Sequence, residues 1–122
     1  MAIERLGPWG EQKAAEFLSA KGYQVLERNY KNRLGEIDLI ALDKNVLCFI
    51  EVKTRRSLVY GCPYESVTRR KQVKISQVAL AYLKHRFGRV DVLARFDVIS
   101  ITRDGPGQDR IEHITNAFEG YC

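Results

Sequence analysis

The residues best suited to chemistry, two acids and a lysine, lie in one segment of this 122-residue chain, 35–55. Two stretches of that segment, 36–42 and 46–55, are rich in Leu, Ile, Val and Phe, which favour strands. A two-residue loop of Lys44 and Asn45 would join them as a β-hairpin and would fix the register of every pair. A four-residue loop keeps this register, whereas a three-residue loop would turn the side chains to opposite faces.

In that register Asp38 lies opposite Glu51, and Glu36 lies opposite Lys53. Directly opposed strand residues have Cβ atoms about 5 Å apart, so the two carboxylates would repel each other within an otherwise apolar strand pair. The repulsion is relieved if one acid is protonated, if both reach solvent, or if a cation neutralises both. A divalent cation would give the pair a use, and oxygen ligands favour Mg²⁺ or Mn²⁺ over zinc.

Lys53 follows Glu51 by two residues, on the same face of the expected strand and about 7 Å further along it. Its amine can hold a water there or stabilise negative charge that develops on a phosphate. The plainer interpretation is a cross-strand ion pair between Glu36 and Lys53. That pair would explain the lysine, but it leaves Asp38 beside Glu51 unexplained.

The expected first helix, 8–21, offers one more acid. At about 100° per residue, Glu11 falls on the apolar side with Ala15 and Leu18, and Glu16 points the other way. Glu11 therefore either caps the helix N-terminus, where negative charge is favourable, or reaches the acid pair. We expect Glu16 to be solvated.

The elements that must position these residues follow from the hydrophobic pattern and from Gly, Pro and capping residues. Their order, α-β-β-β-α-β-β, predicts a single α/β domain in which a central sheet has a helix on each side. Helices are expected at 8–21 and from the N-cap Thr68 to about Phe87, and strands at 23–30, 36–42, 46–55, 94–102 and 111–115.

Charge is unevenly distributed along the chain, whose formal net charge is +5. From Lys53 to Arg89 there are ten basic residues and one acid, Glu65, a net charge of +9 that leaves −4 for the rest. Such asymmetry favours an anionic partner, and a nucleic-acid backbone is the most common one. The alternative is a basic helix face that only contacts solvent.

Several protein classes are disfavoured. Glu4 and Arg5 stand at the start without an apolar stretch after them, and the longest apolar run, 46–50, is too short to cross a bilayer. We therefore expect a cytoplasmic protein with no membrane partner. The three cysteines match no zinc or redox spacing and are expected as reduced thiols. His85 and His113 are far apart in sequence, which argues against a histidine metal site or a Ser-His-Asp triad.

Two motifs, Gly35-Glu36-Ile37-Asp38-Leu39-Ile40 and Phe49-Ile50-Glu51-Val52-Lys53-Thr54-Arg55, resemble the YraN-like family of bacterial proteins. That family is placed in the PD-(D/E)xK nuclease superfamily, near archaeal Holliday-junction resolvases, and the resemblance implies a restriction-endonuclease-like core. The likeness covers nearly the whole chain. It includes Gly10-Glu11, Gly22-Tyr23, Arg28-Asn29-Tyr30, Gly61, Pro63, Val67, Lys71-Gln72, Arg95-Phe96-Asp97-Val98 and Asn116-Ala117-Phe118.

The resemblance implies a role for each residue of the expected site. Asp38, Glu51 and the backbone carbonyl of Val52 would bind Mg²⁺ or Mn²⁺. Lys53 would be the catalytic lysine, and Glu11 the outer acid. Glu36 would support the site, and so would Gln72, which resembles a helix glutamine that some relatives carry behind it. The strict motif has proline before its aspartate, where this chain has Ile37.

The implied activity is metal-dependent hydrolysis of phosphodiester bonds in DNA, with branched or structured DNA among the candidate substrates. Tyr60 and Tyr64 would stack on unpaired bases or pack over the core. The alternative is a nucleic-acid-binding module that keeps the nuclease fold without cleaving. Junction-cutting relatives act as dimers, so a homodimer stays open. The residues expected to contact phosphates are Arg55, Arg56, Arg69, Arg70, Lys71 and Lys74.

Overall fold

The expected order of elements is confirmed by a computed structural model, which describes residues 6–55, 67–89, 91–103 and 107–120. This order and its five-stranded mixed sheet are those of a restriction-endonuclease-like α/β core. The elements are α1 (Leu6–Ala20), β1 (Gln24–Asn32), β2 (Gly35–Asp43), β3 (Val46–Arg55), α2 (Arg69–Phe87), β4 (Ala94–Arg103) and β5 (Asp109–Phe118).

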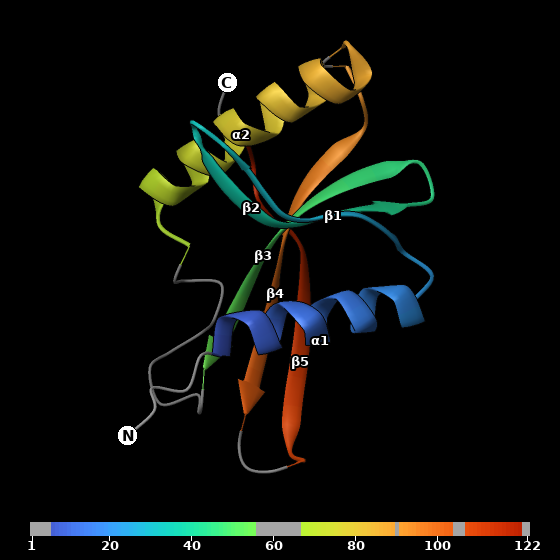
Figure 1. Ribbon diagram of the computed structural model, residues 1–122, viewed down its shortest axis with the longest axis vertical. Coiled ribbons are helices and arrows are strands. Elements are labelled where there is room, and N and C mark those ends of the chain that lie inside the picture. The colour runs from blue at the N-terminus through green and yellow to red at the C-terminus, as the bar shows by residue number, and fades with distance from the viewer. Residues whose placement is uncertain (1–5, 56–66, 90, 104–106, 121–122) are drawn as a thin grey trace.

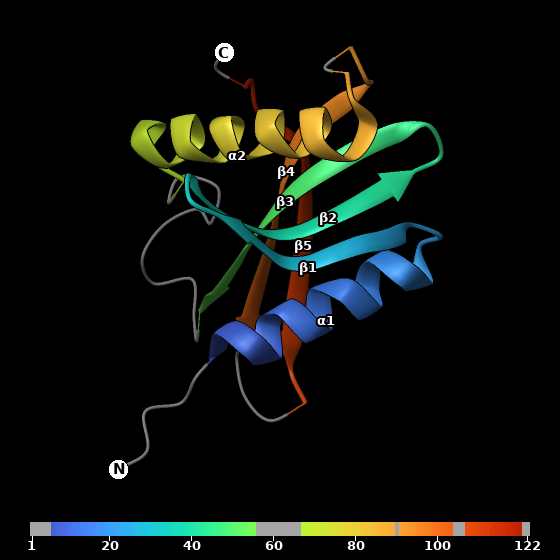
Figure 2. The same ribbon diagram turned by 45° about the horizontal axis from the view of Figure 1, so that its top comes forward.

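The five strands form one sheet in the order β1-β2-β3-β4-β5. Neighbouring strands are antiparallel except β3 and β4, which run parallel. Parallel neighbours cannot be joined by a tight turn, and α2 lies in the connection between them. The two helices cover opposite faces of the sheet, as Figures 1 and 2 show.

The hydrophobic core consists of one apolar layer on each face of the sheet. Alternation along β3 sends Phe49 to the layer under α2 and Ile50 to the layer under α1, so Glu51 returns to the face of α2. The α2 layer includes Ile37, Ile40, Phe49, Val78, Tyr82 and Val98. The α1 layer includes Ala14, Leu18, Leu39, Ile50, Ile99 and Ile101.

The hairpin of β2 and β3 has the register expected from its two-residue loop. Asp43 pairs with Val46, and the regular pairing continues to Leu39 opposite Ile50. Lys44 takes a left-handed backbone conformation in the loop, with φ 56°. Asp38 and Glu51 stand one step beyond the last of these pairs.

The second helix begins and ends as the sequence predicts. Thr68 is its N-cap, and the Thr68 side chain accepts a hydrogen bond from the backbone N–H of Lys71. Gly88 ends the helix in the left-handed conformation, and its N–H donates to the carbonyl of Lys84.

The last strand is longer than expected, so the predicted bounds 111–115 are wrong. It pairs with β4 from Arg103 opposite Asp109 to Phe96 opposite Phe118. Three of the added residues, Asp109, Arg110 and Asn116, are polar, and Asp and Asn have low intrinsic preference for strands. Pairing with a long neighbour outweighs that local preference.

The described residues include no helix long and apolar enough to span a membrane. Cys48 is a free thiol buried in the α1 layer. Burial, followed by the charge of Asp97, raises the pKa of Cys48 to about 11, which keeps the thiol protonated and unreactive. Cys62 and Cys122 lie outside the described residues.

Gly10 controls how closely α1 approaches β3. A Cβ atom at Gly10 would overlap the methyl group of Thr54, whereas one at Gly7 would meet nothing within 4 Å. We expect Gly10→Ala to destabilise the fold by about 1–3 kcal/mol, measured by urea denaturation. Gly7→Ala, in the same helix, should be neutral or slightly stabilising. Thr54→Ser removes the obstructing methyl and should recover part of the loss; equal effects at Gly7 and Gly10 would contradict this packing.

Candidate metal centre

The structure brings Asp38 close to Glu51, so that the charge of Glu51 and a hydrogen bond with it both act on the pKa of the Asp38 carboxyl group. The backbone N–H of Val52 also donates to Asp38 Oδ2 at 2.8 Å, which orients that carboxyl group. Glu51 is only 6% exposed, so little water reaches the pair. Two acids therefore share a poorly solvated position between β2 and β3.

This contact changes the protonation of Asp38. Burial, and then the charge of Glu51 and the hydrogen bond with it, raise the pKa of Asp38 to about 8, while the Val52 amide acts in the opposite direction. Two touching carboxylates cannot both ionise without a large electrostatic cost. At neutral pH the metal-free pair therefore retains a proton.

Two lysines complete the arrangement. Lys53 Nζ lies 3.6 Å from Glu51 Oε2, and Lys71 of α2 forms an ion pair with the same oxygen. Lys71 is near enough to Lys53 to lower the pKa of its amine. We call these four residues, Asp38, Glu51, Lys53 and Lys71, the acid–lysine cluster.

The environments of the two lysines shift their pKa values in opposite directions. Burial, and then the hydrogen bond with Lys71, lower the pKa of Lys53. Burial also acts to lower the pKa of Lys71, but the hydrogen bond to Glu51 and further contacts outweigh it and raise the pKa. Lys71 is therefore the firmer positive charge of the two.

Glu11 is near the cluster without joining it. It is half-buried, and its negative charge contributes to the raised pKa of Asp38. The helix-capping interpretation is wrong, because α1 begins at Leu6 and has no acid in its first turn. Within the described ranges no three His, Cys, Asp or Glu side chains are grouped so that they could hold a metal ion, so Glu11 is not a third ligand in this arrangement. Glu16 is exposed, as expected.

The donor set of the cluster nevertheless fits a hard divalent cation. Mg²⁺ is commonly held by one or two carboxylates and keeps several waters, so Asp38 and Glu51 suffice as protein side chains. The raised pKa of Asp38 and the ion pair of Lys71 with Glu51 both indicate that positive charge is favourable beside the two acids. A metal contact from the carbonyl of Val52 stays a prediction.

The two expected supporting residues do not contact the acids. Glu36 is exposed and pairs with Lys31 of β1 on the other edge of β2. The regular pairing of β2 with β3 ends at Leu39 opposite Ile50, so the expected strand pairs of Asp38 with Glu51 and of Glu36 with Lys53 both lie beyond it. Gln72 donates its side-chain amide to the carbonyl of Val67 at 2.9 Å and thereby secures the start of α2.

Three of the six expected phosphate-binding residues are exposed on the N-terminal half of α2: Arg69, Arg70 and Lys74. Arg55 is half-buried at the end of β3. Lys71 was also expected to contact phosphate, but its ammonium forms an ion pair with Glu51. Arg56, Tyr60 and Tyr64 lie outside the described residues.

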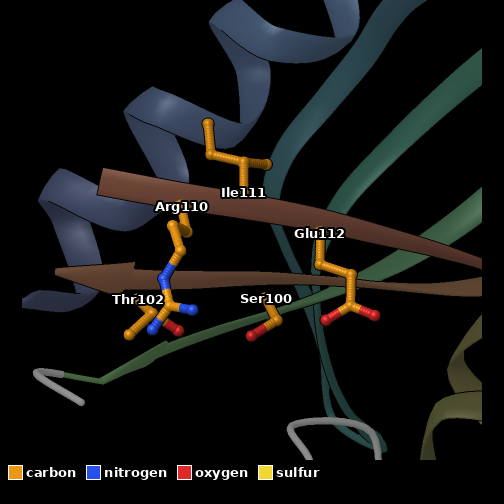
Figure 3. A pocket seen from close by; sticks show the side chains of 5 residues that line it. All are labelled: Ser100, Thr102, Arg110, Ile111 and Glu112. Carbon is orange, nitrogen blue, oxygen red and sulfur yellow. The ribbon is translucent and has the colours of Figure 1, made fainter. Parts of the chain in front are cut away.

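A pocket of about 390 Å³ lies next to the cluster on the same face of the sheet. Its polar lining continues the rows of β3: Lys53 pairs with Ser100, which pairs with Glu112, and Thr102 pairs with Arg110. Figure 3 shows the side chains of Ser100, Thr102, Arg110 and Glu112 on one side of the sheet, while Ile111 points toward α1. The lining residues belong to β4 and β5 and lie beside Lys53 only because β3, β4 and β5 pair. No local sequence pattern therefore predicted that they belong near the site.

Arg95 and Asp97 form an ion pair that belongs to a buried brace on the opposite face of the sheet. Asp97 is fully buried and accepts hydrogen bonds from Arg95, the ring of His113 and the backbone N–H of Asn116. Arg95 also donates to Tyr23 Oη at 2.6 Å. All these groups have partners, so the brace stabilises the fold and takes no part in the acid–lysine cluster.

Residues 10–101, which include the whole cluster, match the family model described as Uncharacterised protein family UPF0102. The chain belongs to the UPF0102 family. A UPF0102 protein of Geobacter sulfurreducens is 52% identical over 93% of this chain and 88% of its own length. A UPF0102 protein of Symbiobacterium thermophilum is 49% identical over 93% of this chain and 96% of its own length. The resemblance of the motifs is thus confirmed at the level of the family.

The raised pKa of Asp38 makes the stability of this UPF0102 protein depend on pH. An aspartate in the unfolded chain titrates near pH 3.9, whereas Asp38 in the fold titrates at about pH 8, so folding takes up a proton between these values. The stability that this group contributes is complete below about pH 4 and is lost as pH rises through about 8.

We expect Asp38→Asn to remove this dependence, because its amide can donate to Glu51 and accept from Val52 at any pH. In chelator, the variant should be more stable than wild type by on the order of 2 kcal/mol at about pH 9, and the gain should shrink toward pH 5. Thermal unfolding measures both. Asp91→Asn is the matched control, since Asp91 is exposed and its pKa is lowered by Arg89. A gain that is the same at both pH values would contradict the shared proton.

Proposed function

We propose that this UPF0102 protein is a metal-dependent endonuclease that hydrolyses phosphodiester bonds in DNA, with branched or structured DNA as the preferred class. The observation that supports it best is the contact of two poorly solvated carboxyl groups with a lysine on the same face. Such an arrangement costs stability and is expected where it serves a function. The resemblance to the YraN-like family implies the same chemistry, metal-dependent hydrolysis of phosphodiester bonds.

Asp38 and Glu51 would hold Mg²⁺ or Mn²⁺, together with the predicted carbonyl of Val52. The cation, when bound, would supply Lewis-acid stabilisation of a phosphoryl oxygen and activation of water. The N–H of Val52 donates to Asp38 Oδ2 and fixes the orientation of that carboxyl group. The hairpin thus pre-orients the Asp38 carboxylate before the substrate arrives.

Lys53 is the residue best placed to act on the substrate. Its side chain is 22% exposed, so its amine is reachable from solvent while β3 restrains its stem. Burial lowers the pKa of Lys53, which makes its proton easier to give up or share. Its amine can orient an attacking water or offset negative charge that develops on the phosphate.

The surroundings of the cluster offer contacts for a phosphate backbone on two sides. Arg69, Arg70 and Lys74 are exposed on α2, and the pocket with Ser100 and Arg110 continues from Lys53 across β4 and β5. Hydroxyl, guanidinium and ammonium groups bind phosphates without reading base sequence. We therefore expect recognition of DNA structure more than of DNA sequence.

A nucleic-acid-binding module that does not cleave is the second candidate. The ion pair of Lys71 with Glu51 favours it, because the protein's own cation already neutralises the acids. The basic side chains on α2 would then bind DNA in the same way. The two candidates differ only in whether the acids serve hydrolysis.

Cleavage assays on labelled branched, flap and single-stranded DNA with Mg²⁺ or Mn²⁺ separate the two candidates. We expect Glu51→Gln to lower the rate by at least about 100-fold, because it removes a metal-binding charge. Lys53→Met should lower the rate by a similar factor and leave the affinity for Mn²⁺ nearly unchanged. Glu16→Gln, an exposed acid on α1, is the matched control. Equal residual cleavage by wild type and Glu51→Gln, with DNA binding intact in both, would rule out the enzyme.

The salt dependence of DNA binding tests where the backbone lies. Replacing Arg69, Arg70 and Lys74 together by Gln should reduce the slope of log affinity against log salt by about 2–3, since each phosphate contact contributes about 0.9. The control variant replaces Lys84, Arg86 and Arg89 by Gln. It removes the same charge at the C-terminal end of α2 and just after it. Fluorescence anisotropy measures both slopes. A flatter slope in the control variant alone would place the DNA at the C-terminal end of α2.

A further inference from the structure

Lys71 lies in the first turn of α2, where the helix itself disfavours a positive charge. It is the third residue of α2, and its backbone N–H is bound by the capping hydroxyl of Thr68 at 3.2 Å. The positive end of the helix dipole lies in this first turn and repels an ammonium group. Its side chain nevertheless lies against Glu51, which offsets that repulsion.

Of the two lysines in the cluster, Lys71 is the one that can leave. Its side chain is 42% exposed, against 22% for Lys53, and it has a flexible four-carbon stem. The cap by Thr68 holds its backbone in place, so the ammonium can turn to solvent while α2 stays docked. Lys53 is attached to a central strand and is more deeply covered.

Lys71 and a divalent cation would compete for the same ligand atom. The Lys71 ammonium contacts Glu51 Oε2, which Lys53 also approaches at 3.6 Å. An oxygen that is paired with the Lys71 ammonium, and has a second ammonium 3.6 Å away, has less capacity for a metal than an unpaired one. A divalent cation that binds Glu51 through Oε2 therefore competes with Lys71.

We propose that Lys71 is an internal counter-cation, which neutralises the acid pair in the metal-free protein and leaves Glu51 when a divalent cation binds. This inference rests on the proposed metal site and adds a step to it. The displaced ammonium joins Arg69 and Arg70 at the exposed start of α2, where it becomes available to a phosphate. Binding of metal and binding of DNA then favour each other.

Substitution of Lys71 tests the exchange directly. Lys71→Met keeps the length and helix preference of the side chain and removes its charge. We expect it to bind Mn²⁺ about fivefold more tightly than wild type in isothermal titration calorimetry, because the competitor is gone. Lys71→Arg should bind Mn²⁺ more weakly than wild type, since a guanidinium holds a carboxylate through two hydrogen bonds. Glu51→Gln gives the background binding.

Lys84→Met is the matched control, on the same helix and with the same change of charge. Lys84 lies 13 residues from Lys71, which is about 20 Å along a helix and beyond the range of unscreened charge at moderate salt. The affinity of the Lys84→Met variant for Mn²⁺ should equal that of wild type. An equal gain at Lys71 and Lys84 would show an effect of net charge and would overturn the proposal.

Thermal unfolding distinguishes displacement of Lys71 from a fixed ion pair. Lys71→Met should have a lower Tm than wild type in chelator and an equal or higher Tm in saturating Mg²⁺, because the metal replaces the lost cation. A deficit of the same size in both conditions, or unchanged Mn²⁺ affinity in both Lys71 variants, would assign Lys71 a purely structural role.

The outcomes also separate this inference from the proposed function. If neither wild type nor Lys71→Met binds Mn²⁺ above the Glu51→Gln background, the metal site is wrong and the exchange falls with it. If the affinities follow the expected order but wild type cleaves no DNA, the exchange stands and the nuclease proposal fails.

Discussion

The contact of Asp38 with Glu51 is the interaction on which the rest of the site depends. Two carboxyl groups in a poorly solvated position repel each other unless a proton or a cation lies between or beside them. Several nearby groups meet that requirement: the N–H of Val52 on Asp38, and the amines of Lys53 and Lys71 on Glu51. The negative charge of Glu11 acts against them. The fold thus supplies positive charge from a strand and from a helix.

The sheet makes this costly contact tolerable by fixing β3 firmly on both faces. Its side chains alternate between two apolar layers, so Phe49 and Ile50 hold the strand in place while Glu51 and Lys53 extend past the covered region. Close approach of α1 at Gly10 adds a second restraint from the far face. The energy of burial far exceeds the repulsion of one acid pair, which is why the pair can persist.

The parts of the site that the sequence predicts are those set by local rules. A two-residue loop fixes the hairpin register from Asp43–Val46 to Leu39–Ile50, the pair next to Asp38 and Glu51, and Thr68 marks the start of α2. The parts that the sequence misses depend on how elements meet. The regular pairing of β2 with β3 ends before it reaches Glu36, and Lys71 reaches Glu51 because of the way α2 packs over the sheet. Neither arrangement produces a periodic pattern in the amino-acid sequence.

The ion pair that favours a binding module is also what a metal site of this kind requires. In the absence of metal, two buried acids without a counter-charge would destabilise the hairpin, so a fold that must survive without metal needs a cation of its own. A singly charged, half-exposed ammonium would meet this need and would still yield to a divalent cation, whereas a buried arginine would not. Under the proposed exchange, Lys71 does not argue against hydrolysis, and its exchangeability is the property that would distinguish a metal site from a permanent salt bridge.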